Sequence, residues 1–174
     1  MMAVTSAGIL LYRLAPEPAV LIAHMGGPYW TGKDAAAWTI PKGEYDPDSE
    51  TALDAALREF GEELGLPAPG RAPASRESGA EPQKAQPYAE LGTFAYSSGK
   101  RVTVFVADGA GFSLDGLVFG EFELEWPPRS GRMVSFPEVD RAEWTTMDAA
   151  RERLVKGQRP AIDALEQHLS AAGA

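Results

Sequence analysis

The segment 41–66, PKGEYDPDSETALDAALREFGEELGL, constrains the fold more than any other part of the chain because it encodes an amphipathic helix. Its large apolar residues recur every three or four positions, which is the spacing of a core-facing stripe. These residues are Leu53, Leu57, Phe60 and Leu64. Asp48 or Ser49 can cap the N-terminus, and Gly65 followed by Pro67 can end the helix. The segment therefore predicts one helix packed on a core.

The same helix carries Glu59, Glu62 and Glu63 on an arc of about 100° away from the leucine stripe. Like charges at this spacing repel by roughly a few tenths of a kcal/mol per pair, so the cluster needs an explanation. Small residues flank the arc and leave room for a ligand; they are Ala52, Ala55 and Ala56. One interpretation is an ordinary solvated face. The other is a site for a hard cation such as Mg²⁺, which binds between carboxylates and substrate phosphates.

Composition excludes several classes of function. The 174 residues suffice for one domain with a hydrophobic core, and the absence of cysteine excludes disulfides and thiolate metal sites. A formal charge of −9 argues against broad nucleic-acid or anionic-membrane binding, but it leaves open a small polyanion held through metal ions. The sequence lacks both a long apolar run and a basic leader, so we expect a cytoplasmic protein with no membrane span.

Strands are predicted on both sides of the helix, and further helices follow them. Apolar, β-branched-rich runs predict strands in 4–14, 19–25, 36–40, twice in 88–108, in 116–132 and in 138–148. Helical patterns occupy 148–156 and 159–170. The Pro-, Ala- and Gly-rich segment 67–87 predicts a flexible loop within a single domain spanning 1–174. This order indicates an α/β sandwich around a mixed sheet.

The helix and the loop before it resemble the signature of the Nudix hydrolase family, G-x(5)-E-x(7)-R-E-U-x-E-E-x-G-U, where U is apolar. The matching residues are Gly43, Glu50, Arg58, Glu59, Phe60, Glu62, Glu63, Gly65 and Leu66. One departure is present, because six residues rather than five separate Gly43 from Glu50. The order of strands and helices is also similar to that of the family. The resemblance implies a Nudix-type α/β/α sandwich around a mixed, mainly antiparallel sheet.

The resemblance also implies roles for individual residues. Glu59, Glu62 and Glu63 would bind Mg²⁺ or Mn²⁺, and the carbonyl of Gly43 would face the metal. Arg58 would pair with Glu50 and hold the geometry of the loop and helix. The general base varies across the family and sometimes lies outside the motif. Our candidate outside it is Glu138, which opens the strand before the last helices.

Cations and aromatic residues in the predicted turns are candidates for substrate contacts. Lys42, Lys100, Arg101, Arg129 and Arg132 could bind phosphates, although solubilising loop charges are an equal alternative for each. Tyr29, Trp30 and Trp126 could stack on a base, with buried packing as the alternative. We interpret His24 and His168 as structural or surface residues, and Glu121, Glu123 and Glu125 as one solvent-facing side of a strand.

These observations predict a metal-dependent pyrophosphohydrolase acting on a nucleoside triphosphate or a dinucleoside polyphosphate. Oxidised nucleotides and nucleotide sugars are alternative substrates. A Nudix-fold sensor that binds a nucleotide without turnover is an alternative from another class, and the complete set of glutamates disfavours it. We expect a small nucleotide substrate, no nucleic-acid partner, and a monomer or homodimer.

Overall fold

The computed structural model describes residues 4–70 and 88–173. Within them, one sheet contains β1 (Thr5–Arg13), β2 (Ala19–Met25), β3 (Trp38–Thr39), β4 (Lys42–Glu44), β5 (Ala89–Ala95), β6 (Arg101–Asp108) and β9 (Val139–Thr145). A separate hairpin contains β7 (Glu121–Glu125) and β8 (Met133–Pro137). The helices are α1 (Ala52–Leu64), α2 (Met147–Arg153), the 3₁₀ turn η1 (Lys156–Gln158) and α3 (Pro160–Ala171). None of these described helices is long and apolar enough to cross a membrane.

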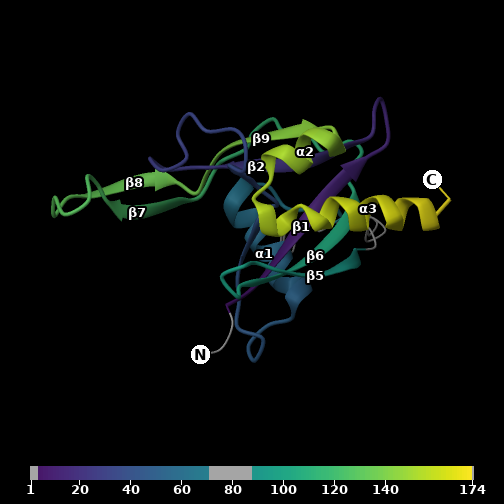
Figure 1. The fold of residues 1–174 in the computed structure, drawn as a ribbon, viewed down its shortest axis with the longest axis horizontal. Coiled ribbons are helices and arrows are strands. Elements are labelled where there is room, and N and C mark those ends of the chain that lie inside the picture. The colour runs from purple at the N-terminus through teal and green to yellow at the C-terminus, as the bar shows by residue number, and fades with distance from the viewer. Residues whose placement is uncertain (1–3, 71–87, 174) are drawn as a thin grey trace, which may run out of the picture.

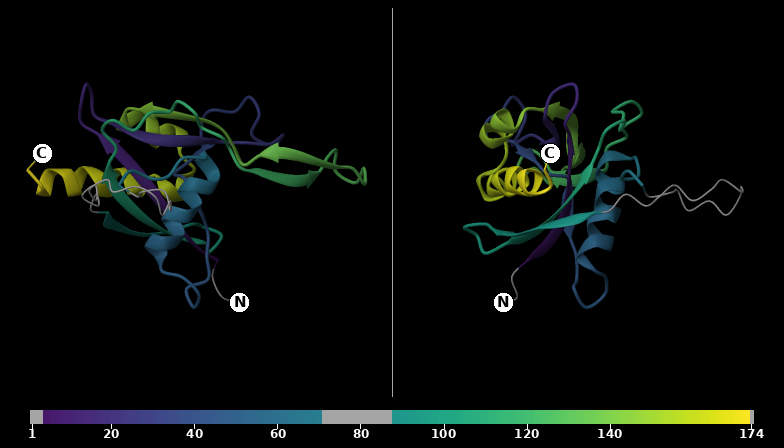
Figure 2. Two further views of the ribbon diagram at one scale, coloured as in Figure 1. Left: turned by 180° about the vertical axis from the view of Figure 1, so that it is seen from behind. Right: turned by 90° about the vertical axis from the view of Figure 1, so that its right-hand side faces the viewer.

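The main sheet lies between two helical layers, with α1 on one face and α2 and α3 on the other (Figure 1 and the right panel of Figure 2). The order is β3-β2-β1-β6-β5, with β4 beside β1 and β9 beside β2. Only the β1–β6 pair is parallel among the described strands. Apolar side chains of β1 are buried on both faces, where they contribute to two separate cores. The predicted α/β sandwich around a mixed, mainly antiparallel sheet is therefore confirmed.

The helix α1 forms where the sequence predicts it, but its cap and its buried face differ in detail. Thr51, rather than Asp48 or Ser49, caps the N-terminus, because its Oγ1 accepts a hydrogen bond from the Asp54 N–H at 3.1 Å. Gly65 ends the helix as predicted, with φ of 72°. The fully buried side chains on α1 are Ala55, Ala56, Phe60 and Leu64. Ala55 and Ala56 therefore face the sheet and let the helix approach it closely, instead of flanking an open site.

Two strands were not predicted from the sequence. We expected the strand at 36–40 to end at Pro41, but β4 follows it directly and pairs antiparallel with β1. The strand β8 returns against β7, with Phe122 opposite Phe136. Together they form a hairpin that projects from the body of the molecule (Figure 1). The predicted flexible loop at 67–87 lies outside the described residues from position 71 onward.

Gly61 lies in the interior of α1, and a Cβ added there would meet no atom within 4 Å. We expect Gly61→Ala to raise the free energy of unfolding by about 0.5–1 kcal/mol, because alanine restricts the unfolded chain more than glycine does. Urea denaturation monitored by circular dichroism measures this change. Gly65→Ala is the matched control. It should destabilise the protein, since Gly65 has positive φ and its Cβ would lie 2.3 Å from the Val118 carbonyl oxygen.

Candidate active site

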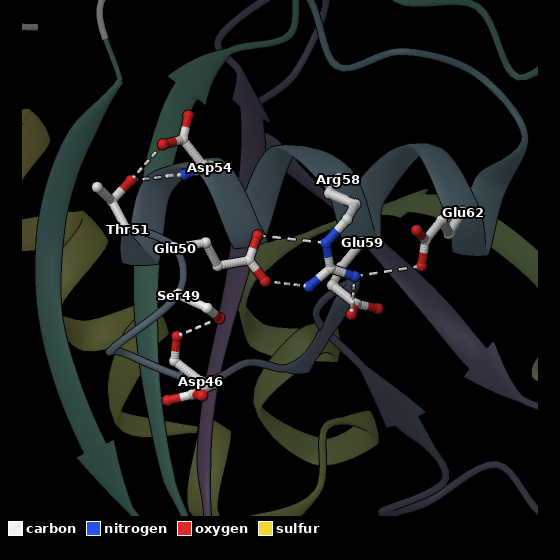
Figure 3. A network of polar contacts seen from close by, with 8 residues as sticks. All are labelled: Asp46, Ser49, Glu50, Thr51, Asp54, Arg58, Glu59 and Glu62. Atoms are coloured by element: carbon white, nitrogen blue, oxygen red, sulfur yellow. Dashed lines mark hydrogen bonds and ion pairs between the residues drawn. The ribbon is translucent and has the colours of Figure 1, made fainter.

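Arg58 organises the carboxylates on the outer side of α1 (Figure 3). Its Nη2 lies 2.5 Å from Glu50 Oε1, and its Nε donates to Glu50 Oε2 at 3.3 Å. Its Nη1 donates to Glu59 Oε1 at 2.6 Å and to Glu62 Oε2 at 3.3 Å. The hydrogen bonds that Arg58 donates to Glu50 are the largest cause of the raised pKa of Arg58. The structure therefore brings the predicted Arg58–Glu50 pair together and shows one guanidinium serving three carboxylates.

The extra residue between Gly43 and Glu50 is accommodated in a turn at Asp46 (Figure 3). The Asp46 carbonyl oxygen accepts hydrogen bonds from the N–H groups of Ser49 and Glu50 at 3.0 and 3.1 Å. The Asp46 carboxylate accepts a further one from the Asp48 N–H at 3.0 Å. Because the added length is taken up there, Glu50 still reaches Arg58.

Gly43 lies directly against the carboxylate of Glu59. A Cβ built on Gly43 would be 1.9 Å from Glu59 Cδ, so only glycine fits at this position without displacing the glutamate. Backbone pairing of β4 with β1 fixes Gly43 opposite Ala7. The longer loop has therefore not moved Gly43 away from the helix.

Glu63 differs from the other glutamates because it points into the protein. Its exposed fraction is 8%, and its Oε2 accepts a hydrogen bond from the Lys42 N–H at 3.0 Å. Burial raises the pKa of Glu63 to about 8, against the opposing effect of the nearby Lys42 ammonium. Burial likewise lowers the pKa of Lys42. The pair thus lies in a poorly hydrated part of the site.

Glu138 approaches the glutamates of α1 from the hairpin root. Its backbone N–H donates to the Gly120 carbonyl oxygen at 2.8 Å, and its own carbonyl oxygen accepts from the Gly26 N–H at 2.9 Å. The pKa of Glu138 is raised first by burial and then by repulsion from Glu59 and Glu62. The Glu138 carboxylate lies near the C-terminal part of α1, because a Cβ built on Gly120 would lie 3.3 Å from Glu138 Oε2 and 3.0 Å from the Glu62 carbonyl oxygen.

A cavity of about 240 Å³ is lined by both charged and aromatic side chains. Its lining residues come from β2 and the loop after it, from β3 and β4, from α1 and from the hairpin root; they include Trp30, Thr39, Lys42, Glu63, Phe122 and Glu138. Phe122 was missed from the sequence because its strand was interpreted as a solvent-facing edge. The alternation of apolar and charged residues in FELEW could have indicated its role. Phe122 points to the opposite face of the strand from the exposed Glu121 and Glu123.

None of the other residues predicted to contact the substrate lines this cavity. Tyr29 and Trp126 pack edge to face, with ring centroids 5.4 Å apart. Lys100 is near the site and forms an ion pair with Glu44 at 3.2 Å, while Arg101 is exposed at the start of β6. Arg129 and Arg132 lie in the turn that connects β7 to β8. The hairpin formed by these strands projects away from the body of the molecule (Figure 1).

The two histidines do not line the cavity that contains Glu63. His24 is buried on β2, where its Nδ1 lies 2.7 Å from Asp140 Oδ1 and its Nε2 lies 2.8 Å from the Lys33 carbonyl oxygen. His168 lies in the last turn of α3. A larger cavity of about 630 Å³ adjoins His24, but charged residues along it pair with one another, as Arg153 does with Asp34.

The carboxylates form a donor set suited to a hard divalent cation. Among residues 4–70 and 88–173, no three acidic, histidine or cysteine side chains converge on one point. Arg58 binds Glu59 and Glu62, and the backbone of Lys42 binds an oxygen of Glu63. The Glu59 carboxylate occupies the space between loop and helix that a side chain at position 43 would fill. The residues therefore fit a metal, provided that their side chains rotate from these partners.

We expect Arg58→Ala to lower the free energy of unfolding by about 1 kcal/mol, because its ion pairs are partly exposed. It should also lower hydrolytic turnover by roughly 10–100-fold, since the glutamates lose the group that orients them. Arg151→Ala is a matched control, because Arg151 pairs with Asp148, Asp163 and Glu166 on the helices of the opposite layer. Equal turnover in the two variants would remove the orienting role of Arg58.

Comparison with known proteins identifies the family. The NUDIX domain model matches residues 2–165, which is most of the chain. The search of curated proteins finds no sequence that matches this chain. Two solved structures share its fold over nearly the whole length of both chains. A Caenorhabditis elegans Ap4A hydrolase is 20% identical, with TM-score 0.59 and coverage of 97% of this chain and 99% of that chain. A MutT protein from Methanosarcina mazei is 15% identical, with TM-score 0.55 and coverage of 96% and 95%.

A third similar structure is the NUDIX domain of Shewanella oneidensis NrtR, complexed with ADP ribose. It is 12% identical, with TM-score 0.59 and coverage of 97% of this chain and 90% of that chain. At these identities the structures establish the fold, while the family model establishes membership. The chain therefore belongs to the Nudix hydrolase family, whose general activity is hydrolysis of a pyrophosphate bond.

Proposed function

We propose that this protein hydrolyses a phosphoanhydride bond in a nucleoside triphosphate or a dinucleoside polyphosphate, with Mg²⁺ or Mn²⁺ as cofactor. The observation that carries the proposal is the 240 Å³ cavity, which joins Glu63, Lys42 and Glu138 to the aromatic residues Trp30 and Phe122. A nucleotide has an aromatic end and a charged end, and this cavity offers complementary groups to both.

Glu59, Glu62 and Glu63 would hold the metal, together with the carbonyl oxygen of Gly43. The cation would neutralise phosphate charge and lower the pKa of a bound water. Arg58 would keep Glu59 and Glu62 oriented through its hydrogen bonds. Glu138 would accept the proton of the attacking water, because its raised pKa makes it a better base than an ordinary carboxylate.

Recognition of the substrate would be divided between the two ends of the cavity. Trp30 and Phe122 would contact the base, while Lys42 and the nearby Lys100 would supply positive charge to the phosphates. The cavity is smaller than a typical pocket for a drug-sized ligand, which has about 300–1,000 Å³. It would therefore take one nucleoside, and the second half of a dinucleoside polyphosphate would extend outside it.

The similarity in fold to an Ap4A hydrolase is the reason for including a dinucleoside polyphosphate among the proposed substrates. The match over residues 2–165 supports a single Nudix domain spanning the chain, with the predicted loop as an excursion from it. We further propose a cytoplasmic monomer or homodimer acting on a small molecule.

A panel of nucleotides tests the proposal. ATP, dGTP, 8-oxo-dGTP, Ap4A, ADP-ribose and UDP-glucose would each be incubated with Mg²⁺, Mn²⁺ or EDTA, and products identified by ion-exchange chromatography. We expect metal-dependent cleavage of ATP, dGTP or Ap4A, and reactions in H₂¹⁸O would locate the attacked phosphorus. Preferential turnover of 8-oxo-dGTP, ADP-ribose or UDP-glucose would assign an alternative substrate class. Tight binding by calorimetry without any turnover would favour the sensor and contradict hydrolysis.

We expect Phe122→Ala to raise KM for the best substrate by about 10-fold or more while changing kcat little. Stacking of a base on an aromatic ring contributes about 1–3 kcal/mol by alanine substitution, and it acts on binding rather than on the reacting phosphate. Leu124→Ala is the control on the same strand, because Leu124 is not among the residues lining the cavity. If both variants raise KM equally, Phe122 contributes only to hairpin packing.

A further inference from the structure

The segment 38–42, which leads into the motif, is held by four hydrogen bonds to three separate parts of the chain: β1, α1 and the turn 155–158. The Trp38 carbonyl oxygen accepts from the Val155 N–H at 3.0 Å, and the Pro41 carbonyl oxygen accepts from the Ile9 N–H at 3.1 Å. The Ile40 N–H donates to Gln158 Oε1 at 2.7 Å, and the Lys42 N–H donates to Glu63 at 3.0 Å. The position of Lys42 and Gly43 therefore depends on contacts well outside the motif.

Gln158 makes the most demanding of these contacts, because its side chain is fully buried in the 3₁₀ turn before α3. Its Oε1 accepts the Ile40 N–H, while its Nε2 donates to Thr39 Oγ1 at 2.9 Å and to the Tyr96 hydroxyl at 2.6 Å. Thr39 Oγ1 in turn donates to the Ile40 carbonyl oxygen at 2.8 Å, so it is free to accept from the amide. Each polar atom of the Gln158 amide thus has a partner of the required kind.

The approach of this turn to the sheet is also sterically specified. A Cβ added to Gly157 would lie 2.2 Å from the Tyr96 ring, so only glycine lets the turn come this close. This close approach brings the Gln158 side chain within hydrogen-bonding distance of Thr39 and Ile40. Thr39 itself lines the cavity that contains Lys42 and Glu63.

We propose that Gln158 is a positioning residue for the active site, acting through the backbone of residues 39–42. By fixing Ile40, it fixes the Lys42 N–H that orients the Glu63 carboxylate, and it fixes the glycine that abuts Glu59. Its loss would let this segment shift, leaving both glutamates less well placed. The consequence for catalysis rests on the proposed hydrolytic function, but the effect on the segment does not.

A buried amide that only stabilises the core would behave differently. It would lower the free energy of unfolding and leave the active site of the folded protein unchanged. The Thr93–Thr103 hydroxyl pair offers a suitable comparison, since it links β5 to β6 at 2.9 Å and these strands are separated from β3 in the sheet by β1 and β2. Thr93→Val removes a partly buried hydrogen bond of similar length at nearly constant volume.

The experiment compares Gln158→Leu with Thr93→Val in the full chain. Steady-state kinetics would give kcat, KM and the Mn²⁺ concentration for half-maximal rate. We expect Gln158→Leu to lower kcat at least 10-fold and to raise that Mn²⁺ concentration, with KM changed less than threefold. Thr93→Val should keep all three values within twofold of wild type.

Native-state hydrogen exchange measured by NMR supplies a second readout that needs no turnover. The Lys42 amide should exchange at least 10-fold faster in Gln158→Leu than in wild type, after correction by core amides of β6 that report global unfolding. Unchanged protection of Lys42 would overturn the positioning role. If Lys42 loses protection but wild-type protein hydrolyses none of the nucleotides, the positioning role stands and the proposed function fails.

Discussion

Glu62→Gln is expected to lower kcat by about 100-fold or more while leaving the fold and its stability nearly unchanged, because it removes a charged oxygen donor without changing shape. The Glu62 side chain is 59% exposed, and its bond to Arg58 at 3.3 Å is weak. Little folding energy therefore depends on its charge. Turnover of the best substrate in the panel and thermal unfolding would be measured on the same preparation.

Glu152→Gln is the matched control, because Glu152 is also an exposed helical glutamate but lies on α2, across the sheet from α1. It should retain wild-type turnover and stability. A Glu62→Gln enzyme that turns over at more than half the wild-type rate, in the presence of saturating Mg²⁺, would remove Glu62 from the metal-binding set.

Glu63→Gln is expected to abolish most turnover and, in the absence of metal, to make the protein more stable. The raised pKa of about 8 means that the folded protein holds a proton at neutral pH which the unfolded chain, with an ordinary pKa near 4.5, has released. The unfolded state therefore binds fewer protons, and the stability of wild type falls as pH rises from about 4.5 to about 8. Glutamine has no such titration, so the variant should gain about 1–3 kcal/mol over wild type at pH 7.5.

Urea denaturation in EDTA at pH 5, 6.5 and 8 measures this difference directly. The charge of Glu63 raises the pKa of Lys42, so the change in their difference with pH reports on Glu63 together with its coupling to Lys42. We expect the free energies of unfolding of Glu63→Gln and wild type to be nearly equal at pH 5. The variant should become increasingly more stable than wild type as the pH rises to 8. Parallel stability curves would show that Glu63 is ionised in the folded protein and would contradict the burial argument. Added Mg²⁺ should narrow the difference, because it favours the ionised carboxylate of wild type.

Periodic and local features were predictable from the sequence. The helix, its end at Gly65, most strands of the main sheet and the Arg58–Glu50 pair all follow from spacing or from a motif within about 25 positions. The buried face of α1 was less predictable. Alanine carries little hydrophobic signal, yet Ala55 and Ala56 are what allow α1 to lie close against the sheet.

Contacts between distant segments could not be deduced from pattern alone. The short strand β4 has no apolar alternation, and it exists because β1 offers it backbone partners. Phe122 becomes part of the cavity only because the hairpin root carries it beside Lys42 and Glu63. Gln158 lies 118 positions from Ile40, and nothing in its neighbours in sequence indicates a buried partner.

The turn at Asp46 has a consequence for how such proteins are recognised. The loop 45–50 is anchored at one end by pairing of β4 with β1 and at the other by the Thr51 cap. Between two fixed ends, one added residue costs little, since loop-closure entropy grows only slowly with length. A signature that demands five residues after the glycine rejects this chain, although Gly43, Glu50 and Glu59 keep their contacts. A search for relatives should therefore require the residues that make these contacts, Gly43, Glu50 and Glu59, and should allow the number of residues between Gly43 and Glu50 to vary.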